Sequence, residues 1–505
     1  MHVDSVPDSL WPRLSESLAQ TMGLNFPPER YRDLQRGLAE AAKAFGFAEL
    51  GACADWMLFG ALTAEQRHSL AGHFTIGETY FFRDRKTFEA LAEHVVPSIV
   101  ERRRGNERRL RLWSAACSTG EEAYSLAILL HELLPDWDDV SILATDINPR
   151  SLQKARAGIY GAWSFRESSA EFKQRYFTPM PDGRLVLSQS IKDRVQFESL
   201  NLSEDGFPSL ATGTNAMDLI LCRNLLMYFT PVHVRRLIDK LHHALIDEGW
   251  LIVSPSECSQ ELFSAYATVN RPGAILYRKS RPPLEQPLAR APNWQPVATA
   301  VPAVDRRTAT EPVQRAAEPR PPATSAAAPD RLGPAQLRYR QGRYQECTDL
   351  LLASSDGSED GSAPSSLAQS AASAGVHSLL TRALANQGKL IEALAACERW
   401  LAADKLDASA HYLHAMILQE RGQQDLARRS LQRAVYLEPD YVLAHFALGN
   451  CARDDASDER ARRHFDNALR LLRTHAADEP VPDSDGMSAG RLAEIISTLL
   501  QSSAA

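Results

Sequence analysis

Apolar residues recur at helical spacing through the first 75 residues of the chain. Leu14, Leu18 and Met22 lie four positions apart, which places them on one face of a helix. Residues 28–45 continue the pattern. We therefore predict a helical domain over residues 1–75.

From residue 109 the pattern changes to short apolar or β-branched runs that alternate with amphipathic helices. This alternation is typical of βαβ units and a largely parallel sheet. We predict a doubly wound α/β domain over residues 76–280. The expected strands are 109–116, 141–146, 195–200, 217–222, 250–254 and 275–278, and the expected helices include 121–134 and 231–245.

The C-terminal part of the chain repeats itself with a period of 34 residues. The repeated positions are Gly388 and Gly422, and Ala393, Ala427 and Ala461. A small residue at a tight turn and Ala where two helices cross closely are typical of tetratricopeptide repeats. We predict an all-α solenoid over residues 335–475, preceded by a partial repeat at Gly342. The concave surface of such a solenoid usually binds a peptide or a helix, and a purely structural role is the alternative.

Two stretches interrupt these regions. Residues 281–334 hold 12 of the 29 prolines, which favours an extended linker. Residues 354–374 are rich in Ser, Gly and Asp and are predicted to be a mobile loop. Residues 476–505 are predicted to be a tail with a short helix.

Composition narrows the class of protein. The 505 residues are 44% hydrophobic and 24% charged, which excludes wholesale disorder. A net charge of −7 gives no global attraction to nucleic acid or anionic lipid. The start of the chain has no signal-peptide pattern, and no run approaches the ~18 apolar residues of a membrane span, so we expect a cytoplasmic protein without membrane insertion. The seven cysteines are widely spaced, and no metal site is expected.

The loop after the first predicted strand, WSAACSTGEE over residues 113–122, is the most informative for chemistry. Gly120 permits a sharp turn, and the helix start that follows has free N–H groups. The G-x-G-x-x-G pattern is absent, and Glu121 and Glu122 would repel a pyrophosphate. These carboxylates suit a cofactor with positive charge, such as S-adenosylmethionine. A capped helix start is the ordinary alternative.

Further candidate groups follow the next strands. Asp146 ends the second strand, where a carboxylate can accept the hydroxyls of a ribose, although a helix cap is equally consistent. Asn201 and Leu202 follow the third strand and are suited to flank an adenine. CRNLLMYF follows the fourth strand at residues 222–229. Ligands of open α/β sheets bind at these carboxyl ends.

These segments carry a family resemblance. WSAACSTGEEAYSLA, ATDI, KARAGIYGAWSFR, FESLNL and DLILCRNLLMYF resemble, in order and spacing, the motifs of CheR-type chemotaxis receptor methyltransferases. ETYFFRD at residues 78–84 resembles the motif between the helical and catalytic domains of that family. The resemblance covers roughly the first 280 residues. It implies a Rossmann-like methyltransferase fold and an enzyme that methylates receptor glutamates with S-adenosylmethionine, releasing S-adenosylhomocysteine.

The resemblance also implies site residues. The cofactor-contacting positions are Gly77, Thr79, Arg83, Glu121, Asp146, Asn201, Leu202, Arg223 and Asn224. Arg83 and Tyr228 match the residues beside the transferred methyl group. Gly77 departs from the Asn that is frequent in the family, and residues 254–257 (SPSE) depart from Gly-His-Ser-Glu.

Methyl transfer to a glutamate requires positioning more than acid–base chemistry. A carboxylate with a reference pKa of about 4.3 is ionised at neutral pH and needs no general base. Arg83 is suited to fix that carboxylate by paired hydrogen bonds, and Tyr228 to orient it. The alternatives are an ion pair of Arg83 with Asp84 or Glu78, and a packed aromatic role for Tyr228.

The expected partners are proteins. Arg32, Arg36 and Lys43 share one side of the second helix, and such a row is either a solvated face or, by the resemblance, a basic surface for the acidic methylation region of a chemoreceptor's cytoplasmic domain. The repeats are expected to dock a further protein, whose identity the sequence leaves open. A scaffold that binds the cofactor with weak catalysis is the alternative function. A small-molecule or nucleic-acid methyltransferase is the third alternative. The net charge disfavours nucleic acid, and Arg223 and Asn224 stand at the place of the Asn-Pro-Pro-Tyr motif of adenine-methylating enzymes.

Overall fold

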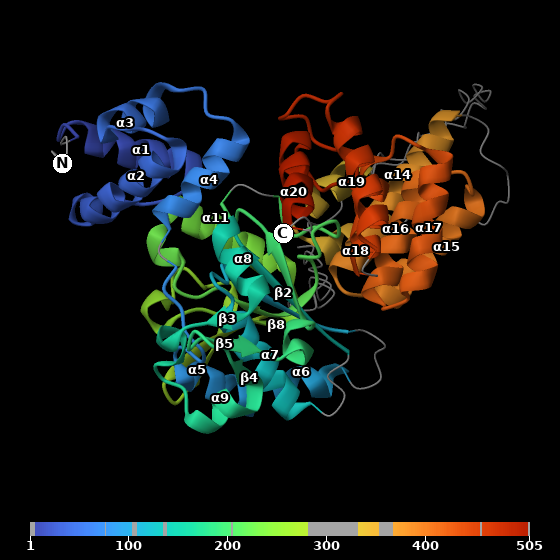
Figure 1. Ribbon diagram of the computed structural model, residues 1–505. Helices are drawn as coiled ribbons and strands as arrows, with labels where there is room; N and C mark the ends of the chain where they lie inside the picture. Colours follow the sequence, from blue (N-terminus) through green and yellow to red (C-terminus); the bar gives the residue numbers. More distant parts are fainter. Residues whose placement is uncertain are drawn as a thin grey trace, which may run out of the picture.

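The computed structural model describes residues 6–75, 77–103, 109–134, 139–203, 206–280, 332–352, 367–454 and 457–502. Helices at the N-terminus lie beside one end of a sheet domain, and a second group of helices packs against the same domain from another side (Figure 1). Most of the predicted linker, and residues 354–366 of the predicted loop, lie outside the described residues.

Four helices form the N-terminal region, as predicted: α1 (Leu10–Met22), α2 (Tyr31–Phe45), α3 (Leu50–Phe59) and α4 (Ala64–Phe74). Their core contains Leu14, Leu18, Leu34 and Leu38, all buried. Beyond α1 the backbone of Asn25 donates to the carbonyl oxygen of Tyr228 at 2.7 Å. This contact ties the helical region to the sheet domain.

The central sheet has seven strands in the order β6-β2-β1-β7-β8-β10-β9. The strands are β1 (Leu110–Ala115), β2 (Val140–Asp146), β6 (Val195–Ser199), β7 (Met217–Leu221), β8 (Leu245–Ile252), β9 (Tyr266–Arg271) and β10 (Ala274–Lys279). The first five in the order are parallel, and β10 and β9 are antiparallel. β1 lies between β2 and β7, so the chain changes direction across the sheet at β1. Ligands of doubly wound sheets bind at such a point.

Helices precede and join these strands, and the doubly wound α/β fold is confirmed. They are α5 (Arg85–Ala90), a π-helical turn (Leu91–Val95), α6 (Val96–Arg103), α7 (Glu121–Leu133), α8 (Pro149–Ala157), α9 (Ala170–Tyr176), α10 (Gln189–Lys192) and α11 (Pro231–Ala244). The predicted fifth strand was placed too late, because the chain enters β8 directly after α11 and pairs with β7 through a register shift.

Some short strands were missed. A second sheet contains β3 (Ile159–Tyr160), β4 (Phe177–Pro179) and β5 (Leu185–Leu187) in the order β3-β5-β4. Strands of two or three residues are too short to show an alternating pattern. The edge strand β9 buries only Tyr266, so its sequence has no apolar face to detect.

The C-terminal helices form consecutive antiparallel pairs, as the period of 34 predicts. They are α12 (Leu332–Arg340), α13 (Tyr344–Leu352), α14 (Leu367–Asn386), α15 (Leu390–Ala403), α16 (Ala408–Glu420), α17 (Gln424–Leu437), α18 (Val442–Asp454) and α19 (Asp458–Leu472), followed by α20 (Ala489–Ser502). Gly342, Gly388 and Gly422 occupy the turns with φ of 68°, 72° and 75°. These left-handed conformations explain the repeated glycine.

Two predicted boundaries are wrong. α14 begins at Leu367, whereas residues 354–374 were predicted to be a loop. Four alanines between 368 and 374 favour the helix strongly enough to outweigh the serines. α12 begins at Leu332, before the predicted end of the linker at Pro334. Pro334 is compatible with a first helical turn because its missing N–H has no partner there.

Candidate functional site

The loop after β1 has an unusual backbone. Ala116 and Ser118 have φ of 65° and 51°, and Gly120 has φ of 94°. A Cβ atom on Gly120 would lie 2.8 Å from the Cβ atom of Ala155, so this position requires glycine. Left-handed non-glycine residues are costly and are retained where the surroundings hold them, often at functional sites.

A pocket opens at the carboxyl ends of β1, β2, β6 and β7. Its lining includes Ala71, Thr75, Gly77, Ser118, Asp146, Ile147, Leu200, Asn201, Leu202, Arg223, Asn224, Tyr228 and Phe229. A smaller adjoining pocket shares part of this wall and adds Thr79, Arg83 and Glu122. The structure therefore brings all but one of the predicted cofactor positions to two neighbouring cavities.

Asp146 connects two parts of the pocket wall. Its carboxylate accepts hydrogen bonds from the backbone N–H groups of Ser118 and Asn148, both at 2.8 Å. Burial raises the pKa of Asp146, and the two backbone donors oppose part of that rise. Asn148, not Asp146, caps α8, because its side chain accepts from the backbone of Arg150 and Ser151.

Asn201 and Leu202 are buried beyond the end of β6. The Asn201 side chain accepts a hydrogen bond from the backbone N–H of Ser203 at 3.0 Å. Across the pocket, α4 contributes Ala71 and Thr75. Apolar walls with a few placed polar groups are typical of small-molecule sites.

Arg223 is a buried cation that joins three segments, and its side chain is 2% exposed. Its Nη2 donates to the carbonyl oxygen of Arg83 at 2.7 Å and lies 3.1 Å from Asp84 Oδ2. Its Nη1 lies 3.2 Å from Glu122 Oε2. This side chain therefore fixes the loop that carries Arg83 against α7.

The two glutamates at the start of α7 have different environments. Glu121 does not line either cavity, and its carboxylate accepts hydrogen bonds from Thr119 at 2.6 Å and Ser164 at 2.8 Å. This position differs from the predicted cofactor contact. Glu122 instead lines the smaller cavity, accepts from Ser114 at 2.7 Å and pairs with Arg223. Burial raises the pKa of Glu122, and Arg223 opposes that rise.

Asn224 has a left-handed backbone with φ of 57°, and Glu257 stabilises it. The Glu257 carboxylate accepts from the backbone N–H groups of Asn224 at 2.8 Å, Leu226 at 2.7 Å and Ser254 at 3.0 Å. Ser254 and Glu257 form a capping box, so the SPSE departure places a capping serine beside the shared glutamate, whose buried carboxylate holds the 223–226 loop. Sequence reasoning missed this role, although the S-x-x-E spacing was visible.

Arg83 faces the smaller cavity. Its Nη1 donates to the carbonyl oxygen of Glu78 at 2.5 Å. The carboxylates that offered alternative ion pairs contact other arginines: Asp84 pairs with Arg223, and Glu78 pairs with Arg166 at 2.9 Å.

Tyr228 lines the larger cavity and is half-buried. The guanidinium of Arg30 lies 4.8 Å from the centre of the Tyr228 ring, a cation–π contact that sequence reasoning missed. Burial raises the pKa of Tyr228, and the charges of Arg30 and Arg83 oppose part of that rise. Gly77 lies nearby, and its carbonyl oxygen accepts from Ser118 Oγ at 3.1 Å.

The predicted basic face lies apart from both cavities. Arg32, Arg36 and Lys43 are exposed on α2, and Arg36 lies 3.6 Å from Asp33. In the described part of the chain, no group of three or more His, Cys, Asp and Glu side chains is arranged to hold a metal ion. A search of the same residues finds no helix with the length and apolar character that a membrane crossing requires.

The chain is similar to several known proteins. Residues 77–271 match the family described as CheR methyltransferase, SAM binding domain. The chain is 35% identical over 218 residues to Chemotaxis protein methyltransferase 1 of Pseudomonas aeruginosa, covering 42% of this chain and 77% of that protein. It is 27% identical over 465 residues to the Probable biofilm formation methyltransferase WspC of Pseudomonas putida, covering 91% and 98% of the two chains. The crystal structure of MamA is similar over 28% of this chain and 77% of its own, with 17% identity and a TM-score of 0.25.

Proposed function

The chain belongs to the CheR family of S-adenosylmethionine-dependent methyltransferases, and from this premise we propose that it converts glutamate side chains of a chemoreceptor's cytoplasmic domain into γ-methyl esters. The placement of Arg83 and Tyr228 at two adjoining cavities beside the carboxyl ends of the strands supports the proposal most directly. The proposed location is the cytoplasm, where such receptor domains lie.

The residues present fit the cofactor. S-adenosylmethionine supplies a methyl group on a positively charged sulfur. Asp146 has the position of a ribose acceptor, and Leu200 and Leu202 give an apolar wall for a base. The adjoining cavity is lined by Glu78 and Glu122 together with Arg83 and Arg223, a mixture of charges that suits a ligand carrying both an ammonium and a carboxylate group. We assign the cofactor's charged end to the Glu122 side of the site.

The proposed role of the chain's own residues is to orient the acceptor carboxylate and to hold the loops of the site in place. Arg83 binds the acceptor carboxylate, and Tyr228 orients it with its hydroxyl group. Arg223 and Glu257 hold the two loops from which these side chains project. No general base is assigned, because the acceptor is already ionised at neutral pH.

The basic face of α2 is proposed to meet the acidic methylation region of the receptor. The repeats are proposed to bind a further protein of a chemosensory array outside the motility pathway. The similarity to WspC over most of both chains supports this assignment.

A labelling experiment tests the reaction class. The purified full chain is incubated with methyl-labelled S-adenosylmethionine and receptor-containing membranes, and the label is tested for release as methanol in mild base. Base-labile label on a receptor-sized band is expected, and Arg83→Ala should remove most of it. Cofactor binding without transfer would instead favour the alternative of a cofactor-binding scaffold, and base-stable label would exclude a carboxyl ester.

A further inference from the structure

The first helices of the three full repeat pairs, α14, α16 and α18, form a surface that we call the inner face. Two segments of the same chain occupy it. Residues 480–488, which precede α20, cover one part of the inner face, and residues 206–215, which connect β6 to β7 in the catalytic domain, cover another.

The first segment is held by buried charge. Asp483 and Asp485 have left-handed backbones with φ of 62° and 56°. Arg382 of α14 pairs with both carboxylates, and its distance to Asp485 is 3.2 Å. Ser409 and Tyr441 donate to Asp483 at 2.8 Å and 2.5 Å. The turn therefore forms a fixed part of the repeat domain.

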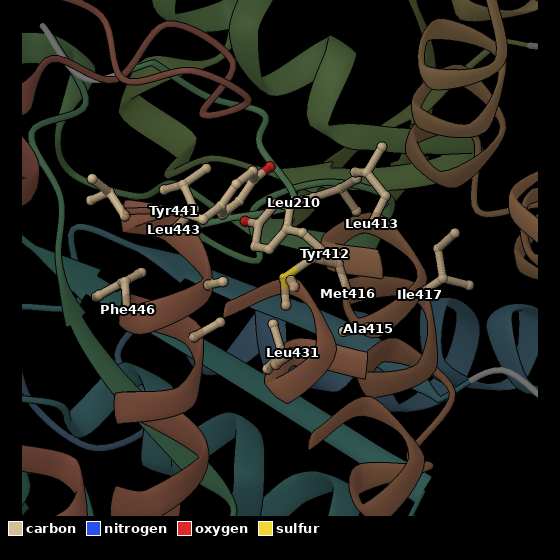
Figure 2. Close-up of a cluster of buried hydrophobic side chains, with 14 of the residues drawn as sticks. Leu210, Tyr412, Leu413, Ala415, Met416, Ile417, Leu431, Tyr441, Leu443 and Phe446 are labelled. Atoms are coloured by element: carbon tan, nitrogen blue, oxygen red, sulfur yellow. The ribbon is translucent and has the colours of Figure 1, made fainter. Parts of the chain in front are cut away.

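The second segment inserts an apolar side chain from the catalytic domain. Leu210 is 7% exposed and belongs to the hydrophobic core of the repeats, in the cluster with Tyr412 and Met416 (Figure 2). The backbone of Gly206 lies close to Asp485. A Cβ atom added to Gly206 would lie 3.3 Å from the carbonyl oxygen of Asp485. Full burial of a leucine is worth about 2 kcal/mol of transfer free energy, so this contact favours association of the two domains.

Glu420 at the end of α16 supplies a polar anchor beside this leucine. Its Oε1 lies 2.9 Å from Arg111 Nη1 of β1 and accepts from Asn215 Nδ2 at 2.9 Å. The side chains of Arg111 and Glu420 are only 11% and 8% exposed. A charged pair with so little solvent access depends strongly on both partners.

Further contacts reach the strand that ends at the cofactor pocket. Arg453 of α18 pairs with Glu198 of β6 at 2.9 Å, and Arg491 of α20 donates to the carbonyl oxygen of Ser199 at 3.4 Å. Asn201 and Leu202 follow within three residues of Ser199. The C-terminal helices therefore contact the chain before these two pocket residues, at Glu198 and Ser199, and after them, at residues 206–215.

We propose that the inner face of the repeats docks the chain's own catalytic domain and thereby positions the pocket wall formed by Asn201 and Leu202. Glu420 and Leu210 are positioning residues in this arrangement. The inference rests on the assignment of the pocket to S-adenosylmethionine and does not depend on which protein accepts the methyl group.

The connection between the domains favours docking over a competing ligand. Because both domains belong to one chain, docking is intramolecular, and the effective concentration of the docked segment is on the order of millimolar. A separate protein that binds the inner face must displace residues 206–215 against that concentration. The partner proposed for the repeats and the docked catalytic domain are therefore mutually exclusive at this face.

A charge-reversal pair in the full chain tests the dock. Glu420→Arg opposes Arg111 and should raise the dissociation constant for S-adenosylhomocysteine, measured by calorimetry, about five- to tenfold. The Michaelis constant for S-adenosylmethionine should rise equally, with turnover at saturation changed less than twofold. The double variant Arg111→Glu/Glu420→Arg should restore most of the affinity. Glu392→Arg, an exposed change of the same charge on α15, should leave the affinity unchanged.

Hydrogen exchange of residues 206–215 shows independently whether the dock has opened. Faster exchange in Glu420→Arg together with weaker binding supports the proposal. Faster exchange with unchanged affinity overturns the positioning role, and unchanged exchange overturns the dock itself. If Glu420→Arg fails to fold, Leu210→Ala is measured with the same expectations. If the parent chain binds the cofactor and shows the expected hydrogen exchange but does not methylate the receptor, the proposed substrate is wrong. The proposed docking of the two domains is then unaffected.

Discussion

Replacing Arg223 by Gln tests whether buried charge holds the site together. The change removes a cation that is 2% exposed and contacts the Arg83 carbonyl oxygen, Asp84 and Glu122. Most of the free-energy cost falls on Glu122, because its side chain is only 13% exposed and water cannot replace the lost cation. Asp84 is 37% exposed and regains water.

The magnitude follows from leaving one buried carboxylate unpaired. Breaking a buried ion pair from one side costs about 3–5 kcal/mol. The lower end applies here because Ser114 still donates to Glu122 at 2.7 Å. We expect a loss of about 3 kcal/mol, which lowers the midpoint of the catalytic domain's thermal transition by about 6–12 °C.

The penalty should depend on pH. Burial already raises the pKa of Glu122 above its value of 4.5 in the unfolded chain, and loss of Arg223 raises the pKa further. A carboxyl whose pKa is higher in the folded state destabilises the fold increasingly as the pH rises from the unfolded to the folded pKa. The difference between Arg223→Gln and the parent should therefore be larger at pH 8 than at pH 5.

Scanning calorimetry at the two pH values checks this reasoning. Glu122→Gln/Arg223→Gln removes the unpaired charge and should recover about 2 kcal/mol of the loss. Arg235→Gln is the matched control, because its pair with Glu261 is exposed and should be worth less than about 1 kcal/mol. Equal transitions for the single and double variants at pH 8 would refute the role of the buried pair.

Four further predictions concern the site and the basic face of α2. Arg83→Ala should lower turnover about 10- to 100-fold, the value of a hydrogen bond between charged groups, with cofactor affinity changed less than threefold in calorimetry. Asp146→Asn should weaken binding of S-adenosylhomocysteine about tenfold in the same measurement, because a ribose loses a charged acceptor. Gly120→Ala should destabilise the fold by about 2 kcal/mol in urea titration, since φ is 94° and its Cβ would clash with a neighbour. Arg32→Glu/Arg36→Glu should raise the Michaelis constant for the receptor but not for the cofactor, and the effect should shrink in high salt.

Much of the pocket could be predicted because strand ends are visible in a sequence. The carboxyl ends of parallel strands converge at one edge of the sheet, so Asp146, Asn201 and Asn224 could be placed together without knowing any contact. The period of 34 similarly predicted the helical pairs, since each repeat has the same turn and the same close crossing. These features are local or periodic.

Other features depend on contacts between distant parts of the chain. Glu121 and Glu122 differ by one position, and a helix turns about 100° per residue, so their carboxylates point to different neighbours. Only the packing of the 160–165 segment against α7 decides which one faces the cavity. The contact of Leu210 with the repeats could not be predicted either, because a single apolar residue in a loop shows no periodicity that indicates what it packs against.

The strained loops of the site share one physical explanation. Asp84 and Asn224 have left-handed backbones, and each lies where a buried charged side chain makes several contacts: Arg223 in the first case and Glu257 in the second. Strain of this kind persists when the surroundings over-determine the conformation. The contacts that hold the loops of Arg83 and Asn224 therefore come from the catalytic domain itself. The strand that leads to Asn201 is in addition contacted by the C-terminal helices, through Arg453 at Glu198 and Arg491 at the carbonyl oxygen of Ser199. A substitution in the repeats should consequently weaken cofactor binding more than it weakens binding of the acceptor.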